Sequence, residues 1–541
     1  MNFLKKDLIF IPVGGSEAIG MNANLYHYND KWILVDLGIS FPDESQLGVD
    51  ILLPDFNFIK SLKNKLLGIF LTHGHEDHFG AIPYFAKDIT CPIWGTEFTL
   101  ALLRRKLKDN NLNSDLKFNN IPKSNNIKIG DFDIEVIKTS HSIPQAISYF
   151  IKTKSEKLFH TGDWKYEPSE NLKENYNTNL LKKISKSNIS CLISDSTNAM
   201  VDGTTPPEKF AFEGLFEIIK IKKGCVLITC FSSNISRIKS LITIAHKTKR
   251  KVCIVGRALK RSVEAAIETS ILPKDFIYIS EKDVKKFNNR DLMIICSGSQ
   301  GEPNSALSRI SSGKHERISL NKGDTVIFSS RKIPGNENAI LKVEERLFEN
   351  NVEVINDEDH PVHVSGHPSK DEIIEMYNLL KPSSVVPVHG NRKQLESNAN
   401  LAKSCQIKNV LIPKNGYVIK ISNGNLSLLD KIEVDTKVYD GGSVVSLKDE
   451  RFIVRKHALW NGIVTASVVI NDQGEVLTVP KLTQSGISDT NKMKNILMEI
   501  SLLIEDLIDN ISDPSLLTDN HLESEIKKII VSQIKKTFSV R

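Results

Sequence analysis

The stretch THGHEDH, residues 72–78, decides the fold, because it places three imidazoles and a carboxylate within six residues. It follows an apolar run and precedes a helical pattern, so we expect it on a loop at the end of a strand. Neutral imidazole nitrogens and carboxylate oxygens are ligands of zinc, whereas packed imidazolium charges would repel one another. Side chains two apart on an extended loop point alike, so His73 and His75 can share one ion. Asp77 and His78 then turn toward a second ion.

Three more residues of ligand type follow predicted strands much further along the chain: His141, Asp163 and His389. Taken singly, each has an ordinary structural explanation. Taken together, they complete two metal sites. The expected ligands are His73, His75 and His141 on one ion, Asp77, His78 and His389 on the other, and Asp163 as a bridge between them.

Two styles of hydrophobic pattern divide the chain. Short strands with few helices are expected up to about residue 205, at 8–13, 32–36, 67–72, 132–138, 147–152 and 189–194. Strands then alternate with amphipathic helices, which is typical of a parallel sheet with crossover helices. The elements expected there are strands 225–229, 251–255, 292–296 and 325–328 and helices 234–246, 258–269 and 336–349. The first style returns after about 365, with a strand at 384–388, a helix at 392–404 and a hairpin of strands 417–421 and 426–429.

These patterns predict an α/β protein whose first domain is discontinuous. The expected parts are 1–205 and 365–430 for the first domain, 206–364 for an inserted domain, 431–455 for a linker and 456–541 for a small C-terminal domain. The C-terminal part carries strands at 463–470 and 476–479 and helices near 488–510 and 521–537. Its first helix has an apolar stripe from Ile496 to Leu507, which favours self-association unless the stripe is the domain's own core.

Composition is that of an ordinary globular protein. Of 541 residues, 40% are hydrophobic and 25% are charged, which excludes collagen-like and disordered chains. The balance of 71 Lys and Arg against 65 Asp and Glu leaves +6, too mild to indicate a nucleic-acid partner by itself. The seven cysteines form no Cys-x-x-Cys pair and lie mostly in apolar runs, so we expect buried, reduced thiols in a cytoplasmic protein. We expect no signal peptide and no membrane helix, since no apolar run approaches about 18 residues.

The ligand pattern resembles the metallo-β-lactamase superfamily, and the inserted block resembles the β-CASP domain of its nucleic-acid-processing branch. Four longer strings are similar to the ribonuclease J family: DSTN at 195–198, SGSQGEP at 297–303, IPGNE at 333–337 and HVSGH at 363–367. The resemblance is strong over about 1–430. It implies a metallo-β-lactamase αββα sandwich with an inserted β-CASP α/β domain and a small C-terminal α/β domain. The chain departs from the pattern at Gln145, where an acidic residue is expected, and at Trp164, where Phe is expected.

The resemblance also implies a function. The implied protein is a cytoplasmic, zinc-dependent ribonuclease with two zinc ions per subunit, which manganese or magnesium could replace. Such an enzyme trims RNA from the 5′ end, prefers a 5′-monophosphate, also cuts internally, and serves mRNA decay and rRNA maturation. RNA is the implied partner, and no membrane association is expected. The resemblance also implies a homodimer or homotetramer, which acts alone or within an RNA-decay assembly.

Further site residues follow from the same resemblance. Asp77, Asp195 and His367 are expected to be catalytic, with His367 as the proton donor and Asp195 orienting it. The residues expected to hold a 5′ phosphate are His363, Val364, Ser365, Gly366, His367 and Ser233. Ser233 could instead be a plain helix N-cap, and Arg237 on the following helix could either touch phosphate or lie on a solvated face.

Three other functions are open to this sequence. The first is a β-CASP nuclease for DNA or tRNA ends, which the longer strings and the lack of a separate DNA-binding motif oppose. The second is a non-catalytic or weakly active partner subunit of an RNA-decay assembly, which the seven filled ligand positions oppose. The third is a small-thioester hydrolase, which needs neither the insertion nor the string at 363–367.

Overall fold

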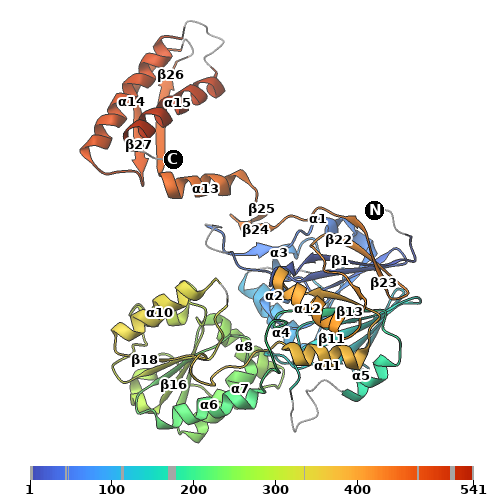
Figure 1. The fold of residues 1–541 in the computed structure, drawn as a ribbon. Helices are drawn as coiled ribbons and strands as arrows, with labels where there is room; N and C mark the ends of the chain where they lie inside the picture. Colours follow the sequence, from blue (N-terminus) through green and yellow to red (C-terminus); the bar gives the residue numbers. More distant parts are fainter. Residues whose placement is uncertain are drawn as a thin grey trace. The chain divides into compact units, whose positions relative to one another are not determined.

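The computed structural model describes residues 4–42, 46, 48–110, 115–167, 178–333, 335–471, 474–511 and 518–538. Two compact units are present in the chain (Figure 1). The first comprises Met1–Asp43 and Asp50–Val444, and the second comprises Glu44–Val49 and Val445–Arg541. Among the described helices, none combines the length and the apolar character that crossing a membrane would require.

An eight-stranded sheet forms one layer of the first unit, in the order β23-β22-β1-β3-β4-β6-β7-β8. Its strands are β1 (Leu8–Gly14), β3 (Ala23–Tyr28), β4 (Lys31–Val35), β6 (Leu66–Phe70), β7 (Ile93–Gly95), β8 (Phe118–Asn120), β22 (Tyr417–Ser422) and β23 (Asn425–Lys431). The predicted hairpin β22–β23 pairs antiparallel with β1, at the opposite end of the sequence. The late segment therefore completes a sheet that the early segment begins.

A seven-stranded sheet forms the second layer, in the order β21-β19-β13-β12-β11-β10-β9. Its strands are β9 (Asn126–Ile129), β10 (Phe132–Lys138), β11 (Ile147–Lys152), β12 (Lys157–His160), β13 (Cys191–Asp195), β19 (Ser384–Val388) and β21 (Asn409–Val410). Strands β13 and β19 are parallel neighbours, with Asp195 opposite Val388. This pairing brings chain segments on either side of the inserted block together.

The two sheets pack face to face over a buried core. Phe10, Tyr26 and Phe70 of the first sheet meet Phe132 and Tyr149 of the second. Helices cover both outer faces: α1 (Asn57–Ser61), α3 (Ile82–Phe85) and α4 (Glu97–Asp109) on the first sheet, and α5 (Thr178–Ser185), α11 (Lys370–Leu380) and α12 (Arg392–Ser404) on the second. The predicted αββα sandwich is confirmed.

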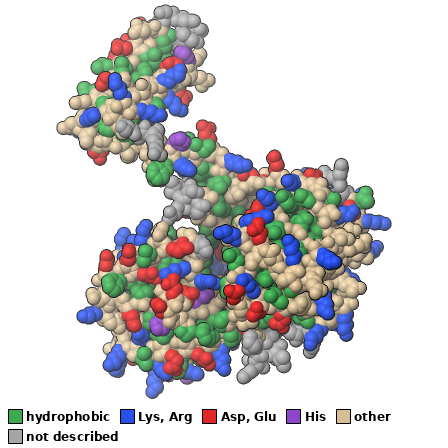
Figure 2. All heavy atoms as spheres, viewed as in Figure 1, with side chains coloured by type: hydrophobic (Ala, Val, Ile, Leu, Met, Phe, Trp, Pro, Cys, Tyr) green, Lys and Arg blue, Asp and Glu red, His purple; other side chains and the backbone are tan. Residues whose placement is uncertain are grey.

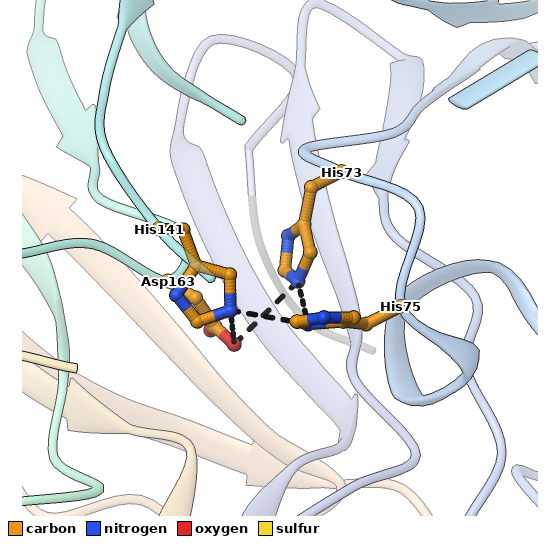
Figure 3. A group of neighbouring side chains, drawn as sticks. All are labelled: His73, His75, His141 and Asp163. Carbon is orange, nitrogen blue, oxygen red and sulfur yellow. Dashed lines mark hydrogen bonds and ion pairs between the residues drawn. The ribbon is translucent and has the colours of Figure 1, made fainter. Parts of the chain in front are cut away.

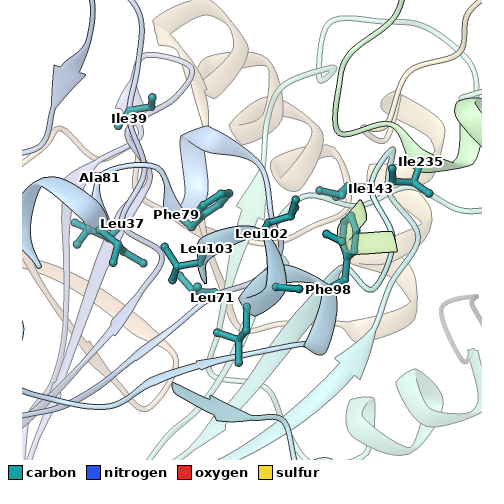
Figure 4. Packing of buried hydrophobic residues seen from close by; sticks show 14 of the residues in the cluster. Leu37, Ile39, Leu71, Phe79, Ala81, Phe98, Leu102, Leu103, Ile143 and Ile235 are labelled. Carbon is teal, nitrogen blue, oxygen red and sulfur yellow. The ribbon is translucent and has the colours of Figure 1, made fainter. Parts of the chain in front are cut away.

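Helix α4 lies in the region before residue 205, where the sequence pattern predicts few helices. Its Phe98, Leu102 and Leu103 are buried in the core of the first unit, on a face that the short-strand pattern around it obscured. Figure 4 shows these side chains beside Leu71 and Phe79, the residues that flank the 72–78 motif in the sequence. The helix thus anchors the loop that carries the histidines.

The inserted block is a three-layer α/β domain around a parallel sheet of order β15-β16-β14-β17-β18. Its strands are β14 (Val226–Thr229), β15 (Lys251–Val255), β16 (Leu292–Cys296), β17 (Thr325–Phe328) and β18 (Glu353–Ile355). Helices α6 (Glu208–Ile221), α7 (Ile235–Lys247) and α8 (Arg257–Glu268) pack on one face, and α9 (Ala306–Ser311) and α10 (Glu337–Glu349) pack on the other. The alternation of strands and helices predicted this parallel sheet correctly.

The segment expected to be a linker, 431–455, contains regular structure. It holds β24 (Lys437–Asp440), β25 (Ser443–Ser446) and the first residues of α13 (Glu450–Asn461). Strand β24 pairs antiparallel with β5 (Leu52–Leu53), so this part of the chain is tied into the first unit. The remaining short elements are β2 (Ser16–Glu17), β20 (Gly390–Asn391), α2 (Glu76–Phe79) and the 3-10 turns Lys63–Lys65, Val284–Lys286 and Asn289–Asp291.

The second unit is a hairpin covered by two helices. Strands β26 (Ile463–Ile470) and β27 (Val476–Ser485) are antiparallel, and α14 (Asn491–Asp509) and α15 (Asp519–Phe538) pack with them. Within α14, Ile496, Ile500 and Ile504 are buried in the unit's own core. The apolar stripe that suggested a partner is therefore mainly internal, because α15 and the hairpin cover it.

Charged side chains of both signs mix on the face that Figure 2 shows. Lysine and arginine lie among aspartate and glutamate, without one basic stripe on this face. This distribution agrees with the mild net charge of +6. All seven cysteines are free, and six of them are buried.

Candidate metal centre

The histidine motif changes from extended chain to helix in the middle. His73 and His75 precede α2, and His75 has extended backbone at φ −83° and ψ 150°. Asp77 and His78 lie within α2 itself and not on the loop, so their side chains leave the chain in another direction. A Cβ on Gly74 would come within 2.8 Å of Leu102 Cδ1, so the glycine lets this loop pack closely against α4.

One donor group consists of three histidines and a carboxylate that point toward one another (Figure 3). His75 Nδ1 lies 3.0 Å from His73 Nε2 and 3.1 Å from His141 Nε2. Asp163 Oδ2 lies 3.6 Å from His73 Nε2 and 3.6 Å from His141 Nε2. We call these four residues the first donor group.

The second donor group consists of Asp77, His78, His389 and the same Asp163. His389 Nε2 lies 3.1 Å from Asp77 Oδ2, and His78 Nε2 lies 3.2 Å from Asp163 Oδ2. In each group the ligand atoms all lie within 4.8 Å of one another. The fold thus brings all seven predicted ligand residues together, with Asp163 common to both groups.

His389 reaches the centre through the pairing of β19 with β13. It directly follows β19 and has the left-handed φ of 55°. Its backbone N–H donates to Gly15 O at 2.8 Å, and the next residues, Gly390–Asn391, pair with β2. This uncommon backbone conformation is held by surrounding contacts, as is frequent at functional sites.

The electrostatics of the two groups differ. Burial lowers the pKa of His73 and His141 well below the usual value and that of His75 to about 4, so the three imidazoles of the first group are neutral. Burial also opposes charge on His389, but Asp163, Asp195 and Asp77 raise its pKa to about 10. The pKa of His78 is likewise raised, because the carboxylates of Asp163 and Asp77 outweigh burial.

Three of the histidines are oriented by their second ring nitrogen. His78 Nδ1 lies 2.8 Å from Asp36 Oδ2, His141 Nδ1 lies 2.6 Å from Gly366 O, and His389 Nδ1 lies 2.8 Å from Thr197 Oγ1. Such contacts fix the ring orientation and the tautomer of metal-ligating histidines. Asp36 was missed by sequence reasoning, although a carboxylate directly after the apolar strand 31–35 was a usable signal.

The donor chemistry fits two metal ions. Each group offers buried imidazole nitrogens and carboxylate oxygens, which are the ligands that zinc takes. The donors converge, and the outward Nδ1 atoms of His73, His78, His141 and His389 already contact protein groups, which leaves the converging inward atoms to bind metal. His73, His75, His141 and Asp163 would hold one ion, and Asp77, His78, His389 and Asp163 the other.

A histidine–aspartate pair borders the metal centre. His367 Nδ1 lies 2.8 Å from Asp195 Oδ2, and His367 Nε2 lies 3.9 Å from Asp163 Oδ2. Burial opposes protonation of His367, but Asp195 and Asp163 raise its pKa above the usual value. The other Asp195 oxygen accepts hydrogen bonds from Thr197 N and Thr197 Oγ1 at 2.9 and 2.8 Å. The His367–Asp195 pair is therefore held in one orientation beside the residues that could bind metal.

The run His363–His367, which we call the recognition segment, touches this centre. Ser365 Oγ accepts hydrogen bonds from Asn198 Nδ2 at 2.8 Å and from His367 N at 3.2 Å, so its own proton is free to donate elsewhere. Within the described residues, His363 Nδ1 is buried without a hydrogen-bond partner. Val364 is buried, and a Cβ on Gly366 would lie 2.7 Å from the His141 ring.

Two expectations near the recognition segment need correction. Arg237 is on no solvated face and touches no open site: it is fully buried and ion-paired with Glu208, at 2.6 Å, and it donates to Val362 O at 2.8 Å. Helix α7 is capped by Asn234, whose side chain accepts from Arg237 N, so Ser233 is not the N-cap. Sequence could not show this, because the burial of Arg237 depends on packing between α6 and α7.

Comparisons with known proteins define the class. Residues 31–181 match the beta-lactamase superfamily domain, residues 223–347 match the beta-CASP domain of ribonuclease J, and residues 355–413 match the Zn-dependent metallo-hydrolase RNA specificity domain. The protein is thus a metallo-hydrolase of the metallo-β-lactamase fold with a β-CASP insertion. A crystal structure of a protein of unknown function from Enterococcus faecalis shares the fold, with a TM-score of 0.55 and 15% identity over 77% of this chain and 100% of that one.

Full-length relatives narrow the class to a family. Ribonuclease J of Sinorhizobium meliloti is 33% identical over 90% of this chain and 86% of its own length. Ribonuclease J of Mycobacterium tuberculosis is 32% identical over 93% of this chain and 91% of its own. The Synechocystis protein is 30% identical, with 93% of this chain and 78% of the relative covered. The chain belongs to the ribonuclease J family.

Proposed function

We propose that the protein hydrolyses RNA phosphodiester bonds at a centre of two zinc ions, which manganese or magnesium could replace. It trims 5′-monophosphate RNA in the 5′-to-3′ direction and also cuts internally, in mRNA decay and rRNA maturation in the cytoplasm. The observation that carries the proposal is the convergence of seven metal-type ligands beside the His367–Asp195 pair. The similarity to ribonuclease J relatives supports RNA as the substrate.

Metal ions bound here would lower the pKa of water toward neutrality and stabilise charge on the phosphoryl oxygens. The chain supplies what the ions do not. The leaving 3′ oxygen of the scissile bond needs a proton, and His367 holds one at Nε2 on the side of Asp163. Asp195 keeps that ring in one orientation through Nδ1, so the proton is aimed at the reacting group.

Recognition of the 5′ end is assigned to the recognition segment together with Ser233. Ser365 has a hydroxyl proton free to donate to a terminal phosphate, as argued from its two accepted hydrogen bonds. Burial lowers the pKa of His363, and the positive charges of Arg237 and Arg331 lower it further. A triphosphate would have to fit two more phosphoryl groups into the same space.

The proposal includes self-association through the second unit, which makes the protein a homodimer or homotetramer. The oligomer acts alone or in an RNA-decay assembly. Although the α14 stripe is internal, other apolar side chains of the unit are exposed. They include Trp460 at 73%, Met498 at 69% and Val479 at 66%. We propose that these side chains contribute to the surface through which copies of the chain associate.

The experiment compares two RNAs of identical sequence, one with a 5′-monophosphate and one with a 5′-triphosphate, with and without a chelator. The proposal predicts stepwise release of mononucleotides from the monophosphate RNA, slower trimming of the triphosphate RNA, and loss of both in chelator with recovery on added zinc or manganese. Cleavage that persists in chelator would contradict the metal centre. Equal trimming of both RNAs would contradict end recognition.

A further inference from the structure

We infer that Thr205 and Glu372 form a clamp that positions His367, the proposed proton donor, relative to the metal ligand Asp163. This inference rests on the proposed function. It assigns a positioning role to two residues that lie outside the seven predicted metal ligands and outside the recognition segment. The clamp is a set of hydrogen bonds among three chain segments that meet beside the metal centre.

The first part of the clamp holds the His367 backbone directly. Thr205 Oγ1 donates to His367 O at 2.7 Å, and Asn198 Nδ2 donates to the same oxygen at 3.2 Å. Thr205 Oγ1 also lies 3.0 Å from Ser369 Oγ. Thr205 is buried and lies on the segment that leaves the sandwich for the β-CASP domain. It therefore ties the departing chain to the returning chain at His367.

The second part of the clamp is the carboxylate of Glu372, which is 2% exposed. Its Oε1 accepts from Tyr166 N at 2.9 Å. Its Oε2 accepts from Thr205 N at 2.8 Å and from Ser369 N at 2.9 Å. One carboxylate thus binds backbone N–H groups of three segments, and the described residues show no ion pair on it.

Each of the three segments matters for the reaction. Tyr166 closely follows the bridging ligand Asp163, Thr205 lies on the departing chain, and Ser369 closely follows His367. The segment from β18 to α11 has neither helix nor strand around His367, so sheet hydrogen bonds do not fix it. Its position depends on side-chain contacts instead, and a displacement of about 1 Å can cost on the order of 100-fold in rate.

Substitutions separate the clamp from general packing. Thr205→Val keeps the shape and removes the donor to His367 O, whereas Thr205→Ser keeps the donor. Glu372→Gln keeps the volume but turns an amide N–H₂ toward backbone N–H groups, so at least one clamp contact is lost. Glu337→Gln is the matched control, because Glu337 accepts from Gly335 N at the start of α10, on an exposed site in the β-CASP domain.

The test uses two RNAs that differ at one atom. One is natural, and the other carries sulfur in place of the bridging 3′ oxygen at the scissile linkage. A thiolate leaves without a proton donor more readily, since thiols have a pKa of about 8.5. We expect Thr205→Val and Glu372→Gln to lower kcat on natural RNA about 10- to 100-fold with KM little changed. Cleavage of the thio-RNA, zinc content and thermal unfolding should stay near wild type, as should all readouts of Thr205→Ser and Glu337→Gln.

A His367→Ala background separates the two possible failures. If His367 is the proton donor, His367→Ala alone lowers natural RNA cleavage and spares the thio-RNA, and adding Thr205→Val or Glu372→Gln then changes kcat less than about twofold. If His367→Ala affects both RNAs equally, the proposed acid is wrong. The other failure requires that His367→Ala lowers cleavage of natural RNA alone. If the clamp variants then lower cleavage of both RNAs equally, or still lower natural RNA cleavage in the His367→Ala background, the clamp is wrong and the proposed acid stands.

Discussion

The metal centre and the recognition segment face the same substrate but are built differently. The centre draws its ligands from separate strand ends across the first unit and buries five of the seven. The recognition segment is one run of five residues, partly exposed, joined to the centre where Gly366 O meets His141 Nδ1. The difference teaches that the proposed chemistry depends on the whole fold, whereas the proposed end selection depends on one short run of residues. Damage to the first should stop all cleavage, whereas loss of a phosphate donor of the second, such as Ser365, should change which RNA ends are trimmed.

The largest effect is expected from His75→Ala. The variant loses a ligand of the first donor group without removing core volume from the sheets. We expect trimming and internal cleavage to fall together by at least about 1,000-fold, equal to about 4 kcal/mol of transition-state stabilisation. Rates on both RNA types, with circular dichroism as the check of folding, measure this. Wild-type turnover by folded, metal-depleted protein would exclude the two-ion account.

Gly366→Ala tests the junction between the two regions. The added methyl group would lie 2.7 Å from the His141 ring, so His141 or the segment has to move. We expect both cleavage activities to fall about 100-fold, with reduced zinc content. Metal analysis alongside the two RNA assays measures this. A variant that lost only 5′-end trimming would show that the segment moves and the ligand stays, which would make the regions more independent than the structure indicates.

Asp195→Asn tests the proton donor through pH. Although burial opposes it, Asp195 helps to raise the pKa of His367, so the ring keeps its proton to higher pH. Without that carboxylate the pKa of His367 falls, so the protonated ring is lost at lower pH. The alkaline limb of the pH–rate profile therefore shifts to lower pH. We expect about a 10- to 100-fold loss of RNA cleavage at mildly alkaline pH and a smaller loss at acidic pH. A profile that keeps its alkaline limb in place would contradict this role.

Removal of residues after Arg455 should have the smallest effect on the chemistry. The deleted part has its own core and none of the seven ligands. We expect light scattering to show fewer subunits per particle than in the full chain. We expect kcat per subunit on short RNA to stay within about threefold of wild type. An unchanged mass would show that the second unit does not mediate association.

Sequence predicted the parts of this molecule that depend on local pattern. The THGHEDH motif, the strands that precede His141 and His389, and the parallel β-CASP sheet all follow from residue type and periodicity. What it missed depends on contacts between distant segments. Asp36 orients His78 from 42 positions away, and Arg237 is buried only because Glu208 and Val362 surround it. No periodicity in the chain records such pairings.

Ser365→Ala tests the central claim, the separation of chemistry from end recognition, most directly. The same variant is measured on 5′-monophosphate RNA and on an RNA with a blocked 5′ end that is cut internally. A hydrogen bond to a charged group is worth roughly 1.5–3 kcal/mol, so trimming of the monophosphate RNA should fall about 10- to 100-fold. Internal cleavage should fall much less, because that path never fills the recognition segment. Equal losses in both assays would show that Ser365 serves the metal centre, and the separation would be wrong.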